Sequence, residues 1–266
     1  MSKESATPGY SSAELMAVVL AREMRDGELG GLGAASQIPM AAVKLAKLTH
    51  APNLSWICGG SGAIDSKLPR LLQSAADYRN LFGAEYRTSM EDVVDLEMRG
   101  RVHFAFLGGM QVDQFGNLNM VCIGDYHKPA VRGPGTVGLI FTAAFGRIYI
   151  YLHHHSPQIL VEKVDFISGP GFYDGSKMRD EFVNKNARGP CMVLTPLSIF
   201  DFEETSRKMR LCSVHPGRTV EQVLAQTGFR PLLRDPVTET QPPTEEELGL
   251  LRTQVDPEGV LRRLIP

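Results

Sequence analysis

Residues 54–62 read LSWICGGSG, a short apolar run that stops at a glycine-rich turn. Apolar runs of this length, bounded by glycine, are typical of strands that are buried on both faces of a sheet. Similar runs return at residues 102–107 and 148–152. Helical spacing of apolar residues covers residues 11–27, and a second helix is expected over residues 39–47. Strands that alternate with helices predict an α/β fold with a mostly parallel sheet flanked by helices.

Two predicted helices have recognisable first turns. Ser11 and Glu14 have the spacing of a capping box, and Gly27 is expected to end the helix that they begin. Thr244 and Glu247 repeat the capping-box spacing before the last helix of the chain.

The C-terminal half is expected to be rich in strands. Candidate strands cover residues 164–167, 192–194, 199–202 and 209–214, and a short helix is expected over residues 219–226. We expect a single domain over residues 1–266, in which residues 1–10 are flexible. Residues 236–243 hold three prolines and are expected to form a linker before the last helix.

Composition excludes several classes of function. The formal net charge is -2 and the basic residues are not clustered, so we expect no nucleic-acid partner. No stretch approaches the length of a membrane span and none resembles a signal peptide, so we expect a cytoplasmic protein without a membrane partner. The 4 cysteines are widely spaced, which indicates buried thiols rather than disulfides or a metal site.

Glycine-rich turns after predicted strands are the candidate walls of a site. They are Gly59-Gly60-Ser61-Gly62, Gly108-Gly109, and the loop from Gly133 to Gly138 that contains Gly135. Ligands collect at the carboxyl ends of parallel strands, where glycine lets backbone N–H groups approach a phosphate or an oxyanion. Each turn taken alone is better explained as a tight connection without a function.

Three other groups carry reactive side chains. His153, His154 and His155 are consecutive, but successive strand residues point to opposite faces, so the three cannot converge on one metal ion. Residues 125–129 combine an acid, a phenol and an imidazole, which suits either acid–base chemistry or a hydrogen-bonded loop. Cys58 is either an activated thiol at a strand end or a small buried side chain.

The segment from Gly108 to Asn119 contains GGMQVD followed by GNLN, and it resembles the β subunits of two-subunit coenzyme A transferases. The resemblance continues through residues 123–129, the loop 133–138, His155 and residues 163–171. It extends to residues 227–229 and 256–257 and so covers nearly the whole chain.

The resemblance implies a coenzyme A transferase-like fold and a homologous α subunit as partner, in a heterodimer that is often doubled to a heterotetramer. It places an acyl-CoA site between the subunits, with coenzyme A as part of the substrate and no permanently bound cofactor. By the same resemblance Gly135 and Gly138 line the thioester pocket, where their N–H groups stabilise an oxyanion. Gln111 and Asn119 shape the pocket, and Ser61, Gly108 and Gly109 contribute to substrate binding.

One departure from this family concerns catalysis. Transferases such as glutaconate CoA-transferase carry a glutamate after the early strand, and it attacks the thioester to form a glutamyl-CoA intermediate. Here Gly59 or Gly60 occupies that position, and glycine has no side chain to acylate. Covalent transfer through this chain is therefore not expected.

Two branches of the family also lack that glutamate. One resembles 3-methylglutaconyl-CoA decarboxylase, which has a cysteine there, and Cys58 lies one or two residues early. The other resembles the β subunit of the ring-opening hydrolase of steroid catabolism, whose α subunit supplies the carboxylate. We favour a hydrolase or a carbon–carbon bond cleaving enzyme on acyl-CoA. A genuine CoA transferase, a decarboxylase-like enzyme and a non-catalytic binding subunit are the alternatives.

Overall fold

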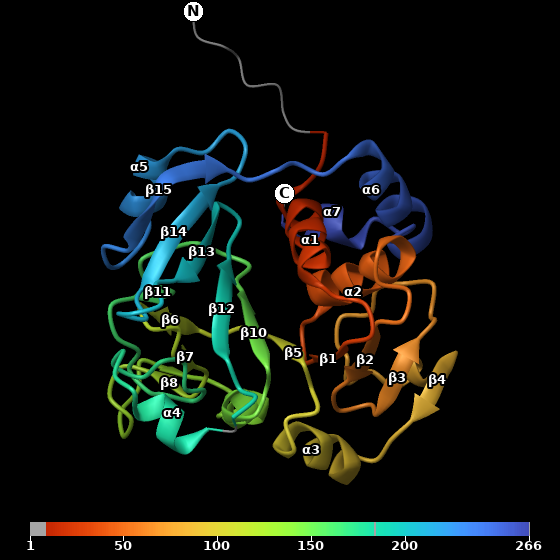
Figure 1. The fold of residues 1–266 in the computed structure, drawn as a ribbon, viewed down its shortest axis with the longest axis horizontal. Coiled ribbons are helices and arrows are strands. Elements are labelled where there is room, and N and C mark those ends of the chain that lie inside the picture. Colours follow the sequence, from red (N-terminus) through yellow and green to blue (C-terminus); the bar gives the residue numbers. More distant parts are fainter. Residues whose placement is uncertain (1–8, 184, 266) are drawn as a thin grey trace, which may run out of the picture.

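A ten-stranded mixed sheet forms the centre of the protein in a computed structural model, which describes residues 9–183 and 185–265. Most of the segment expected to be flexible therefore lies outside the described residues. The strand order is β15-β14-β13-β12-β10-β5-β1-β2-β3-β4, and Figure 1 shows β15 and β4 at the two ends of the sheet. The five central strands are parallel: β12 (Gly189–Leu194), β10 (Arg147–Tyr151), β5 (Phe104–Leu107), β1 (Leu29–Leu32) and β2 (Ser55–Cys58).

Antiparallel pairing appears on both sides of this parallel centre. The flanking strands are β3 (Ala63–Ser66), β4 (Ala84–Arg87), β13 (Ser198–Phe202), β14 (Met209–Val214) and β15 (Leu232–Glu239). β3 reverses directly after β2 because residues 59–62 are too short for a crossover, and β13 reverses after β12 for the same reason. The sheet is therefore parallel at its centre and mixed as a whole. The C-terminal half does not hold the expected excess of strands, because the sheet takes β1 to β5 from the first half of the chain and five strands, β10 and β12 to β15, from the second.

Helices α1 (Ser12–Glu23) and α2 (Gln37–Thr49) cover one face of the sheet. The Ser11–Glu14 capping box is present, but α1 ends at Glu23, before Gly27, because Met24 is already extended. α2 extends the predicted helix at both ends, and Pro39 lies in its first turn, where a missing N–H costs nothing.

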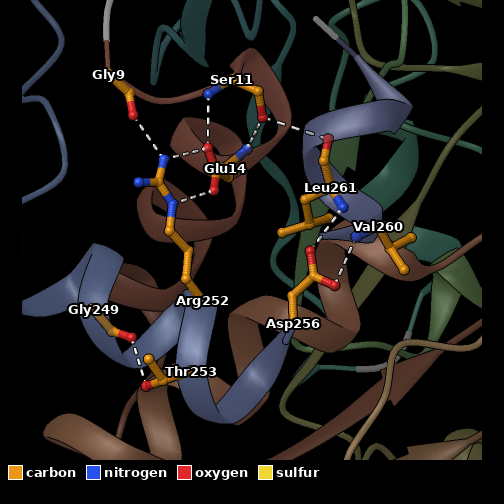
Figure 2. A network of polar contacts seen from close by, with 9 residues as sticks. All are labelled: Gly9, Ser11, Glu14, Gly249, Arg252, Thr253, Asp256, Val260 and Leu261. Atoms are coloured by element: carbon orange, nitrogen blue, oxygen red, sulfur yellow. Dashed lines mark hydrogen bonds and ion pairs between the residues drawn. The ribbon is translucent and has the colours of Figure 1, made fainter. Parts of the chain in front are cut away.

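The C-terminal helices pack beside α1, as Figure 1 shows, although they lie at the opposite end of the sequence. They are α6 (Glu245–Leu250), the π-helical turn η3 (Leu251–Val255) and α7 (Val260–Leu264). Arg252 donates from Nε to Glu14 at 2.8 Å, and Asp256 accepts from the backbone nitrogens of Val260 and Leu261 at 2.8 Å (Figure 2). The Thr244–Glu247 capping box is also present.

The opposite face of the sheet carries α3 (Met90–Met98) and the 3-10 helix η2 (Val137–Ala143). Strand residues alternate between the two faces: Phe104 and Phe106 pack under α1 and α2, whereas Ala105 belongs to the second cluster. Two separate apolar layers therefore sandwich the sheet.

Smaller elements surround the second face. They are β6 (Gln111–Asp113), β7 (Leu118–Asn119), β11 (Leu160–Val161), β8 (Cys122–Ile123), β9 (Val131–Arg132), α4 (Met178–Phe182) and α5 (Val220–Ala225). The 3-10 turn η1 (Tyr78–Leu81) lies beside β3 and β4, and its Leu81 packs on the first cluster. The strand predicted over residues 164–167 is absent, and the strand of this region is β11. Asp165 instead accepts hydrogen bonds from Gln111 Nε2 at 3.0 Å and from the Gly124 nitrogen at 2.9 Å.

The predicted linker over residues 236–243 is wrong in its first half. Residues 236–239 belong to β15, an edge strand whose pairing with β14 shifts register between Leu211 and Ser213. Pro236 fits at this irregularity because an edge strand tolerates a residue without an N–H. Only residues 240–243 connect β15 to α6. Within the part of the chain that the structure describes, no helix combines the length and the apolar character needed to cross a membrane.

Candidate active site

A cavity of about 390 Å³ lies at the carboxyl ends of β1, β2 and β5. Residues 31–34 of the β1 end, Gly59 and Gly60 after β2, and Leu107 at the end of β5 form its walls. Ligands of parallel sheets bind at this edge, so the cavity is the candidate active site. The cavity brings together two of the predicted glycine-rich segments, the turn with Gly59 and Gly60 and the loop with Gly138.

Two helices complete the cavity. Met90, Val93, Val94 and Glu97 follow the i, i+3, i+4, i+7 spacing and so line it from one face of α3. From the other side η2 contributes Val137, Gly138 and Phe141. Ser89 begins α3, where its hydroxyl accepts from the Asp92 nitrogen at 3.1 Å.

Glu97 is the one ionisable side chain among the described residues that line the cavity. Its side chain is partly buried, and this burial raises the pKa of Glu97 to about 7. The carboxyl group is therefore close to half protonated at neutral pH, which suits hydrogen donation or proton transfer. Sequence reasoning missed Glu97, although Ser89–Asp92 capping and the spacing of Met90, Val93 and Val94 were visible signals.

The turn after β2 has no room for a side chain at either position where the family glutamate is expected. A Cβ added to Gly59 would lie 2.8 Å from the Leu32 carbonyl oxygen. Gly60 has φ +87, and its added Cβ would lie 2.8 Å from Ala76 Cβ. The glutamate is thus absent from the sequence and also sterically excluded from the turn.

Ser61 holds the turn together and does not line the cavity. Its buried hydroxyl lies 2.7 Å from the Ala75 carbonyl oxygen and 3.2 Å from the Cys58 carbonyl oxygen. The predicted contact of Ser61 with substrate therefore has no support in the geometry of this chain, because the hydroxyl already donates to backbone.

Gln111 and Asn119 form a buried amide pair across β6 and β7. Asn119 Nδ2 donates to Gln111 Oε1 at 2.7 Å, and Gln111 Nε2 donates to Asp165 at 3.0 Å. Neither side chain lines the cavity, nor do Gly108 and Gly109. Gly109 lies against this pair, because a Cβ there would lie 2.8 Å from the Gln111 carbonyl oxygen. The pair fixes the segment that follows β5, and its role in substrate binding stays a prediction.

The two glycines of the predicted oxyanion loop differ. Gly135 has φ +103 and does not line the cavity, and its N–H donates to the Met120 carbonyl oxygen at 3.2 Å. Gly138 lines the cavity. The first backbone hydrogen bond of η2 is donated by the next residue, from the Leu139 N–H to the Thr136 carbonyl oxygen. Gly138 is therefore placed to offer a donor to a ligand, whereas the N–H of Gly135 is already used.

Cys58 faces the layer beneath α2, on the side of the sheet opposite the cavity, while Ile57 lines the cavity. The side chain is fully buried, and this burial raises the pKa of the Cys58 thiol to about 12. The structure supports the buried thiol rather than the activated one. The described cysteines are all free thiols, and Cys191 is less buried than the other three.

The remaining polar groups of interest lie away from the cavity. Asp125 accepts from the backbone nitrogens of His127 at 2.9 Å and Lys128 at 3.0 Å, as a hydrogen-bonded loop does. Asp65 is buried and accepts from Ser55 Oγ at 2.8 Å and from the Trp56 nitrogen at 2.9 Å, so its role is structural.

A buried pair of histidines lies on either side of Thr195. His155 contacts Thr195 Oγ1 at 2.9 Å and Thr227 Oγ1 at 3.0 Å. His215 contacts the Thr195 carbonyl oxygen at 2.8 Å and Thr240 Oγ1 at 2.9 Å. Burial lowers the pKa of each histidine to about 4, so both are neutral hydrogen-bonding groups. Of the predicted histidine tract, His155 is thus structural.

The sequence profile described as Coenzyme A transferase matches residues 13–226. The chain belongs to the coenzyme A transferase family. It is 34% identical to one of the subunits of 3-oxoadipate CoA-transferase from Pseudomonas knackmussii, over 91% of this chain and 92% of that protein. It is 29% identical to the IpdB subunit of the cholesterol ring-cleaving hydrolase from Mycobacterium tuberculosis, over 95% of this chain and 98% of that protein.

Two solved structures have the same fold as this chain. Glutaconate coenzyme A-transferase from Acidaminococcus fermentans matches with a TM-score of 0.86 at 28% identity, over 96% of this chain and 98% of that one. The decarboxylase AibA/AibB matches with a TM-score of 0.82 at 27% identity, over the same shares of 96% and 98%. The predicted fold and family are confirmed, and the relatives include subunits of two-subunit enzymes.

Proposed function

We propose that this chain is the β subunit of an acyl-CoA hydrolase or carbon–carbon bond cleaving enzyme whose catalytic glutamate comes from a homologous α subunit. The observation that carries the proposal is the turn after β2, where Gly59 and Gly60 leave no room for a Cβ. A glutamyl-CoA intermediate formed on this chain needs a carboxylate at that point. The reaction therefore proceeds by attack of water, with coenzyme A as part of the substrate and no permanently bound cofactor.

The cavity supports attack on a carbonyl group. The Gly138 N–H donates to the oxygen that gains negative charge when water adds to the thioester carbonyl. The partner's carboxylate accepts the proton that this water loses. In hydrolysis the carbon–sulfur bond then breaks, and the sulfur of coenzyme A takes a proton as it leaves. The two subunits assemble as a heterodimer, doubled to a heterotetramer.

A genuine CoA transferase is the second candidate, favoured by the 34% identity to the 3-oxoadipate CoA-transferase chain. In that case the acylated carboxylate lies on another polypeptide, because neither Gly59 nor Gly60 leaves room for a Cβ. A decarboxylase that depends on a reactive cysteine is disfavoured, because the Cys58 thiol faces away from the cavity and its pKa is about 12.

The test uses the complex of this chain with its proposed α subunit, which is to be sought among the genes beside the one that encodes this chain. The reaction is run in ¹⁸O-water, and the enzyme is treated with hydroxylamine or borohydride during turnover. Hydrolysis or hydrolytic ring opening places ¹⁸O in a product carboxylate without any acyl acceptor. A trapped enzyme-bound CoA thioester and a strict need for an acceptor would instead identify a transferase. We expect no turnover by the isolated chain, and loss of activity when one α-subunit glutamate becomes alanine.

A further inference from the structure

The cavity is apolar apart from a single side chain. Aliphatic or aromatic groups of α3, η2 and the strands line it, among them Ile57, Val93 and Phe141, and glycines form much of the rest. Its volume of about 390 Å³ lies within the range of small-molecule sites, about 300–1,000 Å³. An apolar group of an acyl chain fits these walls.

Glu97 is the exception, and the fold places it in the cavity. Residues 90, 93, 94 and 97 share one face of α3, so the carboxyl group lies beyond three apolar side chains of the same face. Among residues 9–183 and 185–265, no hydrogen-bond donor or cation is paired with this carboxyl group. A partly buried carboxylate without a partner is unfavourable, so the group either holds its proton or pairs with a ligand.

Among the described residues that line the cavity, Glu97 has no charged neighbour. Neither the strands nor η2 present a titratable side chain to the cavity within the described chain. Arg101, four residues after Glu97 and beyond the end of α3, is exposed and does not line the cavity. Burial is the one cause that raises the pKa of Glu97.

The absence of a cationic side chain from the described cavity walls limits the charge that the acyl group can carry. A second carboxylate on the acyl chain needs a lysine, arginine or histidine to pair with it in an apolar site. The described walls offer none, and Glu97 in its ionised form repels a carboxylate. A carbonyl oxygen, by contrast, accepts a hydrogen bond from the protonated carboxyl group of Glu97.

We propose that Glu97 determines substrate specificity by donating a hydrogen bond, in its protonated form, to an uncharged acceptor oxygen on an otherwise apolar acyl group. The substrate class is thus an acyl-CoA with an apolar chain or ring that carries an oxo group, rather than a dicarboxylic acyl-CoA. This inference rests on the proposed function, because it takes the cavity to be the acyl site.

The experiment measures dissociation constants of the two-subunit complex by isothermal titration. The probes are non-hydrolysable thioethers of the form CoA–S–CH₂–CO–R, in which R is an alkyl chain, the same chain with one added oxo group at successive positions, or the same chain ending in a carboxylate. The variants are Glu97→Gln, Glu97→Leu and the matched control Glu91→Gln, which changes an exposed acid of the same helix. Each is measured at pH 6 and pH 8.5, on either side of the Glu97 pKa of about 7.

At pH 6 we expect the wild type to bind one oxo probe about tenfold more tightly than the alkyl probe, the worth of one good hydrogen bond. The preference falls at pH 8.5, because ionised Glu97 has no proton to donate. Glu97→Gln keeps an N–H donor, so its preference is the same at both pH values. Glu97→Leu loses the preference and binds the alkyl probe at least as well. Glu91→Gln behaves as the wild type.

Retention of the oxo preference in Glu97→Leu, or tightest binding of the carboxylate probe, overturns the inference while acyl-CoA binding itself stands. The opposite outcome can also be recognised. If a CoA thioester is trapped on the enzyme in the ¹⁸O experiment, the hydrolase proposal is wrong, but a preference for the oxo probe that depends on Glu97 still supports this inference. If the folded complex binds none of the probes, the acyl site is elsewhere, and this inference is overturned together with the proposed function.

Discussion

Arg179 donates from Nη2 to the carbonyl oxygen of Thr142 at 2.7 Å and so ties α4 to the end of η2. The guanidinium group also donates from Nη1 to the carbonyl oxygens of Pro170 at 3.0 Å and Gly171 at 2.9 Å. The side chain is 1% exposed, and burial lowers the pKa of Arg179 to about 10. One buried cation therefore fixes the 3-10 helix that forms a wall of the candidate active site.

Replacing Arg179 with alanine is expected to destabilise the fold strongly. The change removes the donor from two buried carbonyl oxygens and one partly buried one, at a cost of about 3 kcal/mol or more. For a chain of this size, that loss lowers the thermal midpoint by roughly 6 °C or more. Differential scanning calorimetry of the complex measures the shift, with Lys177→Ala, an exposed neighbour, as the control. An equal midpoint in the two variants would show that Arg179 does not support η2.

Cys58→Ala is expected to retain most activity. The thiol is buried on the face of the sheet away from the cavity, so removing it deletes no reacting group. Turnover of the variant complex under saturating substrate tests this. A fall of more than about a hundredfold, or roughly 2.7 kcal/mol, contradicts the assignment and revives a cysteine-dependent reaction.

Gly138→Val is expected to reduce turnover by about a hundredfold or more without unfolding the protein. The nearest atom to an added Cβ is Phe141 Cδ2 at 3.9 Å, so the side chain fits but projects where the acyl-CoA binds. Gly249→Val on α6 is the matched control, because nothing lies within 4 Å of its added Cβ. Thermal midpoints separate blocked binding from misfolding, and wild-type turnover by Gly138→Val removes this loop from the site.

Gly135→Val tests the other glycine of the loop and is expected to act through the backbone. A residue other than glycine at φ +103 is strained, at a cost of roughly 1–2 kcal/mol, although nothing lies within 4 Å of its Cβ. We expect a lower thermal midpoint together with reduced turnover. Reduced turnover at an unchanged midpoint would point to a direct contact of Gly135 with substrate.

Gly60→Glu is not expected to create a covalent transferase. Residue 60 has φ +87 and its Cβ would press on Ala76. We therefore expect the variant to be less stable and its glutamate not to reach a position from which it can attack the thioester. Mass spectrometry after borohydride treatment should find no modified glutamate in the variant complex. Detection of one would show that the turn rearranges more readily than its contacts indicate.

Acid is expected to destabilise the protein through His155 and His215. Their pKa values are about 4 in the folded state, below the ordinary value of 6.5, so the unfolded chain binds more protons between these limits. The contribution of each histidine to the free energy of unfolding is complete above about pH 6.5 and declines as the pH falls toward 4. At pH 5 the loss is about 2 kcal/mol per histidine. Urea denaturation at pH 7.5 and 5 measures this. Substituting both with glutamine should shrink the difference, and an unchanged difference would assign it to other groups.

Local signals in the sequence predicted much of the fold. The capping boxes at Ser11 and Thr244 are present, and the apolar runs at residues 54–58 and 148–152 form buried central strands. The prediction of a strand over residues 164–167 was wrong, because Asp165 is held by hydrogen bonds to Gln111 and Gly124, which are distant in the sequence. A pattern of apolar residues does not encode such bonds.

The site was only partly predictable for a related reason. Glycine content identified the turn at Gly59 and the loop of Gly138, which meet at the cavity. Which backbone N–H remains unused depends on distant geometry, so Gly135 and Gly138 look alike in the sequence but differ in the structure. Glu97 was missed because its significance comes from burial, which its helix alone does not reveal.

The contact between α1 and the last helices orders the events of synthesis. Glu14 meets Arg252 across 238 residues of sequence, and Leu251, Val255 and Leu261 join the same apolar cluster as α1. Because α1 precedes α6, η3 and α7 by more than 200 residues, it leaves the ribosome well before them and its surface stays partly uncovered until they emerge. A chain truncated before residue 245 therefore exposes apolar residues of α1, far from the truncation in sequence, where quality-control proteins can recognise them.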